Sequence, residues 1–219
     1  AVKIAQLREQ AATVGVTIDL RLRRGEEPYQ EIVQEAMQQG SDLIITRRRG
    51  KRGFLANLLV GEMVSKVVAH APCSVLVTAR EAQLWRRRVL VAVNPSEVPW
   101  NTVALAARVA IDSQLPLWVV CIAETAGSDT DAQRALAAAV AHARALGATV
   151  DGEVLAGKPH AQLLEAARRG GADLIVLGRH GATRLSRAWI GSVAQKVIGL
   201  AECPVLVCVS PMPAEDRAP

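Results

Sequence analysis

The sequence predicts an α/β fold that consists of two copies of one strand-and-helix unit. The first observation is an internal repeat, because Asp42–Ile45 matches Asp173–Val176 at an offset of 131. Two further pairs of segments match at an offset of 130: Lys66–Val68 with Lys196–Ile198, and Ala71–Val77 with Ala201–Val207. The second observation is that short apolar runs alternate with amphipathic segments of helical length. Together they favour a mostly parallel sheet with helices on both faces.

The second copy, predicted as a domain over residues 88–210, contains a complete set of elements. Its predicted strands are Arg88–Val93, Leu115–Ile122, Thr149–Leu155, Asp173–Leu177 and Pro204–Val209. Its predicted helices are Trp100–Ile111, Asp129–Leu146, a segment that opens at Pro159, and Ser192–Leu200. Pro159 fits the first turn of a helix, where its missing N–H group is harmless. Strands that alternate with helices imply right-handed crossovers between parallel strands.

The first copy, predicted as a domain over residues 1–80, is incomplete. The repeat offset places the counterpart of Arg88 near position −43. We therefore expect this unit to lack its first two strands and one helix, and residues 1–14 to form the end of its second helix. Such a unit exposes apolar surface unless another chain covers it. Residues 211–219 are expected to form a flexible tail.

Composition favours a soluble, cytoplasmic protein with real hydrophobic cores. Half of the residues are apolar, yet no run approaches the ~18 apolar residues of a membrane span, and no signal peptide is visible. The four cysteines lack CxxC spacing and are expected to be buried thiols. The net charge of +5 favours anionic partners, but aromatic residues make up only 3%, which disfavours nucleic acid. The basic clusters Arg47–Arg49 and Arg86–Arg88 are expected to be solvated.

A glycine segment after the fourth strand of the second copy is a candidate phosphate cradle. Gly178 and Gly181 are followed, after nine residues, by Gly191 and Ser192. Glycines let the backbone approach an anion closely, and N–H groups at a helix N-terminus point at it. An ordinary turn, with Ser192 as a helix N-cap, is the alternative. Arg179 and Arg184 are expected either to neutralise phosphates or to lie in solvent.

The same segment carries a family resemblance. The pattern Gly178-x2-Gly181-x9-Gly191-Ser192 matches the ATP-binding signature of universal stress proteins (the UspA family). Val193–Ile198 and Cys203–Val207 are similar to that family's final helix and strand, and the tandem layout is similar to the UspE type. The resemblance implies a Rossmann-like five-stranded parallel sheet in the order 3-2-1-4-5 in each unit. The ligand site then lies at the switch point between strands one and four.

The resemblance also implies how the ligand, ATP with or without Mg²⁺, would be held. The glycine segment would hold the phosphates, and the loop after strand one would contact the nucleoside. Asn94 and Ser96 follow strand one, and Ile122 is expected at the end of strand two. Asn94 is a departure, because nucleotide-binding members usually carry aspartate there. Asparagine keeps one acceptor oxygen and adds donors, and Pro95 replaces a common glycine.

The equivalent site in the first copy departs further from the pattern. Arg47 stands in place of Gly178, and Gly50 matches Gly181. Ten residues rather than nine then precede Gly61, and Glu62 replaces Ser192. A carboxylate at the phosphate end repels a triphosphate. The sequence therefore predicts a degenerate first site and a single nucleotide site in the whole chain.

The leading functional hypothesis is a cytoplasmic stress-response module that binds an adenine nucleotide and is not an enzyme. The alternatives are an interaction protein in which both sites have lapsed, and a weak ATPase. His180 could contact phosphate or lie on the loop surface, and there is no Walker lysine. The apolar strands Ser74–Thr78 and Pro204–Val209 are predicted sheet edges, which predicts pairing within the tandem or in a homodimer. The protein partner and the stress cannot be read from the sequence.

Overall fold

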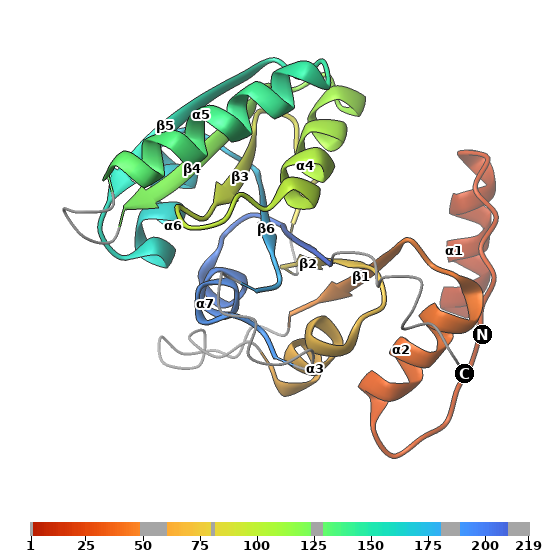
Figure 1. The fold of residues 1–219 in the computed structure, drawn as a ribbon. Helices are drawn as coiled ribbons and strands as arrows, with labels where there is room; N and C mark the ends of the chain where they lie inside the picture. Colours follow the sequence, from red (N-terminus) through yellow and green to blue (C-terminus); the bar gives the residue numbers. More distant parts are fainter. Residues whose placement is uncertain (1, 49–60, 80–81, 124–128, 181–188, 210–219) are drawn as a thin grey trace.

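The computed structural model describes residues 2–48, 61–79, 82–123, 129–180 and 189–209 (Figure 1). The helices are α1 (Val2–Thr13), α2 (Pro28–Gln39), α3 (Glu62–His70), α4 (Trp100–Asp112), α5 (Asp129–Ala145), α6 (Pro159–Arg169) and α7 (Ser192–Leu200). The strands are β1 (Leu43–Arg47), β2 (Ser74–Thr78), β3 (Val89–Val93), β4 (Leu117–Ala123), β5 (Val150–Ala156), β6 (Leu174–Gly178) and β7 (Val205–Cys208). The predicted tail at 211–219, Gly50, Gly181 and Arg184 lie outside the described residues.

The strands form one seven-stranded sheet in the order β1-β2-β7-β6-β3-β4-β5 (Figure 1). Its β5-β4-β3-β6-β7 part has the expected order 3-2-1-4-5, and all neighbours in it are parallel. The predicted strand order therefore holds within copy two, while the order of the whole sheet differs from it because the sheet continues beyond β7. The described part of copy one contributes only β1 and β2, and these extend the sheet of copy two.

An antiparallel pairing of β2 with β7 joins the two copies, and we call it the seam. Leu76 lies opposite Leu206, with Val75 opposite Val207 and Val77 opposite Val205. Leu76 and Leu206 are equivalent residues at the repeat offset of 130, so the seam has local two-fold symmetry. Each strand covers the other's apolar edge, which is the intramolecular alternative among the predicted pairings.

Two apolar cores lie on opposite faces of the sheet. One face is covered by α2, α3, α6 and α7, and its core contains buried residues of both copies, including Ile44, Val75, Leu90, Ile175 and Val205. The other face is covered by α4 and α5, whose alanine-rich inner sides pack on β3, β4 and β6. Because these strands are buried on both faces, their sequences are continuous apolar runs rather than alternating ones. The first core is thus shared by the two copies.

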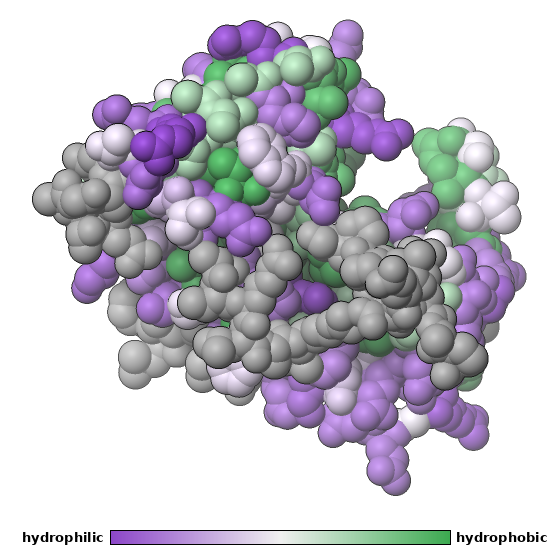
Figure 2. Space-filling model, in the orientation of Figure 1, coloured by the Kyte–Doolittle hydropathy of each residue, from purple (hydrophilic) through white to green (hydrophobic). Residues whose placement is uncertain are grey.

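The sheet face that α4 and α5 cover in copy two is exposed to solvent in copy one. Leu43 and Ile45 of β1 are 42% and 66% exposed, whereas their counterparts Leu174 and Val176 are fully buried. The difference arises because α4 covers β6 in copy two, while no described helix covers β1 on this side. Helix α1 lies away from the sheet (Figure 1), and hydrophobic residues show on the surface over α1 and the turn that follows (Figure 2). Copy one therefore exposes apolar surface, as the sequence predicts.

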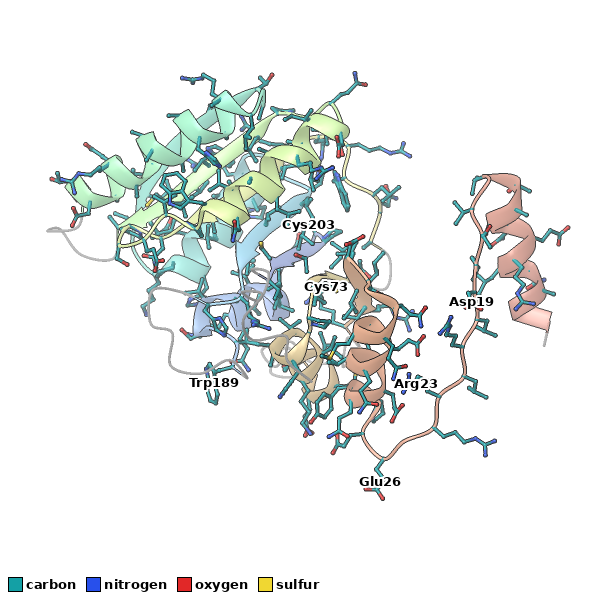
Figure 3. The ribbon with its side chains drawn as sticks, turned by 45° about the vertical axis from the view of Figure 1, so that its right-hand side comes forward. Asp19, Arg23, Glu26, Cys73, Trp189 and Cys203 are labelled. Atoms are coloured by element: carbon teal, nitrogen blue, oxygen red, sulfur yellow. The ribbon has the colours of Figure 1, made fainter. Side chains whose placement is uncertain are left out.

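The segment between α1 and α2 is not a strand, although the repeat makes residues 19–25 the counterpart of β5. In copy two, β5 pairs with β4, and the described part of copy one has no strand to take the place of β4. The segment instead lies against α2 through ion pairs. Arg23 contacts Glu31 at 2.8 Å and Glu35 at 2.6 Å (Figure 3).

Candidate nucleotide site

The parallel pairing of β3 with β6 brings the two predicted halves of the site together. Both strands run in the same direction, with Val91 opposite Val176, so the chain leaves them at the same edge of the sheet. Asn94 and Ser96 follow β3, and Gly178 is the last residue of β6. The N-terminal turn of α4 lies beside them, because Thr102 contacts the Gly178 position. This edge is the switch point at which open α/β sheets bind ligands.

Gly178 stands in a tight space. A Cβ at this position would lie 3.3 Å from the carbonyl oxygen of His180 and 3.5 Å from Oγ1 of Thr102. Thr102 is 4% exposed, and it is the only buried polar or charged residue in the described part of the chain. Sequence reasoning missed it. The available signal was a hydroxyl residue in the first turn of α4, on the same side as the buried residues Val103 and Ala106.

Two hydrogen bonds join the ends of the glycine segment to each other, and a third joins its start to β7. The N–H of Arg179 donates to the carbonyl of Cys208 at 3.1 Å, and the N–H of Gly191 donates to the carbonyl of Arg179 at 2.9 Å. Nε2 of His180 lies 2.5 Å from the carbonyl oxygen of Trp189, so this ring nitrogen carries the proton. Gly178 and the start of α7 are thereby held close to each other. The side chain of Trp189 projects outward (Figure 3).

Helix α7 presents an N-terminus without a side-chain cap. Its N-cap residue is Gly191, with φ −57° and ψ 144°, and Ser192 is the first residue of the helix. The alternative in which Ser192 is the N-cap is therefore wrong. Since glycine brings no acceptor, the first-turn N–H groups have no side-chain partner at the cap. The positive end of the helix dipole also favours an anion here.

The guanidinium of Arg179 lies against copy one. Its Nη1 donates to the carbonyls of Ala69 at 3.0 Å and Ala71 at 3.3 Å, at the C-terminus of α3. Burial lowers the pKa of Arg179. Its Nε is buried and has no hydrogen-bond partner among the described residues. The contact was not foreseen from the sequence, which offered phosphate or solvent as the surroundings of this side chain.

Asn94 forms a closed turn with Ser96. Its Oδ1 accepts the backbone N–H of Ser96 at 3.1 Å and the hydroxyl of Ser96 at 3.0 Å. Because only the amide oxygen can accept an N–H, the orientation of the Asn94 amide is fixed, and its NH₂ group carries the donors that remain. Asn94 therefore offers donors, and its acceptor oxygen is already engaged.

Ile122 does not occupy the predicted position at the end of a strand. It lies inside β4, one residue before the strand ends at Ala123, and is 4% exposed. Its side chain belongs to the core shared by the two copies, with Leu90 and Leu163. Its side chain therefore serves packing, and the chain leaves β4 only after Ala123.

Copy one shows the same helix start with different side chains. The N-cap of α3 is Gly61, with φ −52° and ψ 140°, and Glu62 takes the place of Ser192. The Glu62 side chain is 82% exposed and pairs with Lys66 at 2.9 Å. Arg47 is an exposed residue at the end of β1, and within the described chain β1 pairs with β2 alone. The described part of copy one thus lacks a strand equivalent to β3 and, with it, the nucleoside half of a site.

None of the acidic, histidine and cysteine side chains of the described ranges gather into a group of three that could hold a metal ion. All four cysteines are free thiols; Cys121 and Cys208 are buried as predicted, whereas Cys73 and Cys203 are half-buried. Burial raises the pKa of Cys121 and Cys203 to about 11, so these thiols are protonated at neutral pH. Across the described ranges, no helix has the length and apolar character needed to cross a membrane.

The family model of the Universal stress protein family matches residues 1–79 and 86–209. The chain belongs to this family. It is 42% identical over 81 residues to universal stress protein MJ0531 of Methanocaldococcus jannaschii, a match that covers 37% of this chain and 48% of that protein. It is 26% identical over 165 residues to universal stress protein Slr1230 of Synechocystis, covering 75% of this chain and 57% of that protein. The chain spans about half the length of these curated relatives.

Solved structures of universal stress proteins share this fold. A putative universal stress protein from Pseudomonas aeruginosa superposes with a TM-score of 0.73 at 22% identity, covering 94% of this chain and 77% of that one. A universal stress protein from Archaeoglobus fulgidus gives a TM-score of 0.74 at 20% identity, with coverages of 94% and 74%. At this level of identity the likeness concerns the fold alone. The predicted division into domains at residues 1–80 and 88–210 stays a prediction.

Proposed function

We propose that copy two of this universal stress protein binds an adenine nucleotide, ATP, at the edge of the sheet formed by the ends of β3 and β6. The observation that carries the proposal is the start of α7, which is capped by a glycine and hydrogen-bonded to Arg179 directly beside Gly178. This arrangement supports phosphate binding because it combines backbone N–H donors, a helix N-terminus and a residue without a side chain.

The nucleoside end of the proposed site is built from donors. The Asn94 oxygen is engaged by Ser96, so the Asn94 NH₂ group is what remains for an acceptor atom of the ribose or base. A ribose hydroxyl that needs an acceptor would have to compete with Ser96 for the Asn94 oxygen. We therefore expect the phosphates to supply most of the affinity.

We propose ATP as a ligand and not as a substrate. Among the described residues, the side chains in contact with the Gly178 position and with Asn94 are the hydroxyls of Thr102 and Ser96, which do not act as bases near neutral pH. If Mg²⁺ accompanies the nucleotide, we expect the phosphates to hold it, since Mg²⁺ commonly keeps its waters and binds through phosphate oxygens. Phosphate release above the buffer background would contradict this part of the proposal.

Calorimetric titration with ATP, together with thermal unfolding, tests the proposal. We expect heat of binding and a rise in the melting temperature that grows with ATP concentration. Gly61→Ala in the degenerate copy is the matched control, because a Cβ at Gly61 meets no atom of the described residues within 4 Å, and it should leave both signals unchanged. The absence of both binding heat and a melting shift at millimolar ATP would refute nucleotide binding.

One observation favours a second function, docking of another protein. The face of β1 that carries Leu43 and Ile45 is exposed, and copy one carries the altered site residues Arg47 and Glu62. In this alternative both nucleotide sites have lapsed and the exposed surface binds a protein partner. The same titration separates the two functions, because a docking protein without a nucleotide site gives no heat with ATP.

A further inference from the structure

Two equivalent arginines cross the seam in opposite directions. Arg48 follows β1, Arg179 follows β6, and the repeat offset of 131 separates them. Arg48 of copy one donates to carbonyls at the C-terminus of α7, and Arg179 of copy two donates to carbonyls at the C-terminus of α3. The acceptors are equivalent as well, at an offset of 130: Gly199 and Ala201 for Arg48, and Ala69 and Ala71 for Arg179. We call each contact an arginine clamp.

The chemistry of the clamps suits a permanent contact between the copies. The last carbonyls of a helix lack intrahelical partners and carry partial negative charge, and a guanidinium can meet two of them at once. Both arginines are partly buried, and burial lowers the pKa of each. Hydrogen bonds in such partly desolvated surroundings are stronger than at the surface. Each clamp therefore fixes the final helix of one copy to the other copy.

Only one of the two clamps is built on the candidate phosphate loop. The main chain of Arg179 donates to Cys208 and accepts from Gly191, so the residue is part of the connection between Gly178 and α7. The main chain of Arg48 donates to Thr78 in the degenerate copy. Arg179 thus joins the proposed nucleotide site and the seam within one residue. Arg48 makes the same kind of contact, but its main chain is not part of a proposed nucleotide site.

We propose that Arg179 couples nucleotide binding in copy two to the packing of α3 of copy one. This inference rests on the proposed nucleotide site. A nucleotide that binds the backbone at Gly178 and at the N-terminus of α7 also fixes the point from which the Arg179 side chain reaches α3, and so favours the clamp. Linkage requires the reverse effect to be equally large, so a formed clamp strengthens nucleotide binding.

The competing outcome is that the nucleotide releases α3, which would speed hydrogen exchange there instead of slowing it. The buried Nε of Arg179 has no partner among the described residues, so the guanidinium could leave α3 and bind a phosphate oxygen instead. The nucleotide would then release α3 rather than hold it. The sign of the change at α3 therefore decides between the two.

Hydrogen exchange of the full chain, measured by mass spectrometry with and without saturating ATP, tests the coupling at a distance from the ligand. We expect ATP to slow exchange about fivefold or more at the C-terminal turn of α3, where the N–H of Ala71 bonds to Val67. Arg179→Ala should abolish this protection and weaken ATP binding by a similar factor. Arg179→Lys keeps the charge but loses the planar fork, and should act in the same direction.

Arg48→Ala is the matched control, because it removes the equivalent clamp from the same seam. It should lower the melting temperature about as much as Arg179→Ala, yet leave the ATP affinity within about twofold and keep the ATP-dependent protection of α3. Faster or unchanged exchange of α3 in wild-type protein that binds ATP would overturn the coupling alone. An equal loss of ATP affinity in both variants would overturn it too. Wild-type protein that does not bind ATP would overturn both the coupling and the proposed function.

Discussion

A side chain at Gly178 would disturb the proposed site directly. The carbonyl of His180 and the hydroxyl of Thr102 already stand 3.3 and 3.5 Å from the position of a Cβ, so a branched side chain must push the loop away. We expect Gly178→Val to weaken ATP binding about tenfold or more, which corresponds to about 1.4 kcal/mol. Calorimetry measures the effect, with Gly61→Ala as the control. An unchanged affinity would show that the phosphates bind elsewhere.

Asn94→Asp tests the nucleoside end of the site. An aspartate can accept the N–H and hydroxyl of Ser96 with one oxygen, as Asn94 does, and it keeps a second acceptor oxygen for a ribose hydroxyl. We therefore expect ATP and adenosine to bind several-fold more tightly, in line with about 0.5–1.5 kcal/mol for one hydrogen bond. Titrations with both ligands give the measurement. Equal affinities for the wild-type protein and the variant would mean that the ribose does not contact residue 94.

At the scale of single residues, the sequence predicted which candidate residues come together better than it predicted the contacts of each side chain. Gly178, Gly191 and Asn94 come to one edge of the sheet because each lies next to a strand or helix that local periodicity predicts, and because the strand order implied by the family resemblance places β3 beside β6. The positions of Arg179 and Ile122 could not be foreseen in the same way. The acceptors of Arg179 lie 108 and 110 residues away across the seam, and the core that contains Ile122 is completed by helices far from β4 in the sequence.

Helix α6 ends on the ring of Trp118, and this contact is sensitive to one methyl group. Gly170 is the C-cap residue, and a Cβ there would overlap the ring. The ring cannot retreat easily, since the guanidiniums of Arg88 and Arg169 stand 5.0 and 5.9 Å from its centre. We expect Gly170→Ala to lower the free energy of unfolding by about 1–3 kcal/mol in urea titrations. Adding Trp118→Leu should recover part of the loss; a double variant no more stable than Gly170→Ala would contradict this contact.

The segment before β3 is anchored to the start of β6 by the carboxylate of Asp173. It accepts the N–H groups of three consecutive residues, Arg86, Arg87 and Arg88. Burial acts to raise the pKa of Asp173, but these hydrogen bonds outweigh it and hold the pKa below its ordinary value of 3.8. A lowered pKa in the folded state means that the stabilisation is present above pH 3.8 and is lost as the pH falls through the folded value.

Asp173→Asn should therefore lose stability at neutral pH and lose less of it in acid. We expect the difference in the free energy of unfolding between wild type and variant to be constant from pH 7 to about 5 and to shrink below pH 3.8. Urea unfolding at several pH values measures this difference. A gap that stays constant down to pH 2.5 would show that the ionised carboxylate adds nothing to this anchor.

At the scale of elements, most of the fold was predictable. Helix α7 and strand β2 have the predicted bounds. The bounds of the five strands of copy two differ from the predicted ones by only one or two residues. The spacing of apolar residues within these elements, and the turn residues at their ends, predict them locally. The conformation of the segment 19–25 could not be predicted from the repeat, because a β-strand forms only where a neighbouring strand can hydrogen-bond to it. Its counterpart β5 pairs with β4, and the described part of copy one has no equivalent of β4.

The whole molecule is held together by a core that both copies share, which predicts cooperative unfolding. Buried residues of α2, α3, α6 and α7 belong to one cluster under a continuous sheet, so loosening one copy exposes apolar surface of the other. The pattern of elements predicted two similar units, and it left open whether their apolar edge strands pair within the tandem or between two chains. Which edges meet depends on tertiary packing across the seam rather than on local periodicity.

Leu76→Ala at the centre of the seam tests this cooperativity. Leu76 is 6% exposed and lies opposite Leu206, and its truncation should cost about 2–5 kcal/mol. All four tryptophans follow residue 84, so tryptophan fluorescence reports on copy two while the substitution lies in copy one. We expect the fluorescence midpoint and the calorimetric midpoint to fall together, in one transition. Leu84→Ala, at a side chain 71% exposed, should change stability by less than about 0.5 kcal/mol. A fluorescence midpoint that stays at the wild-type value would mean that the copies unfold independently, because damage at the seam would then not reach the core of copy two.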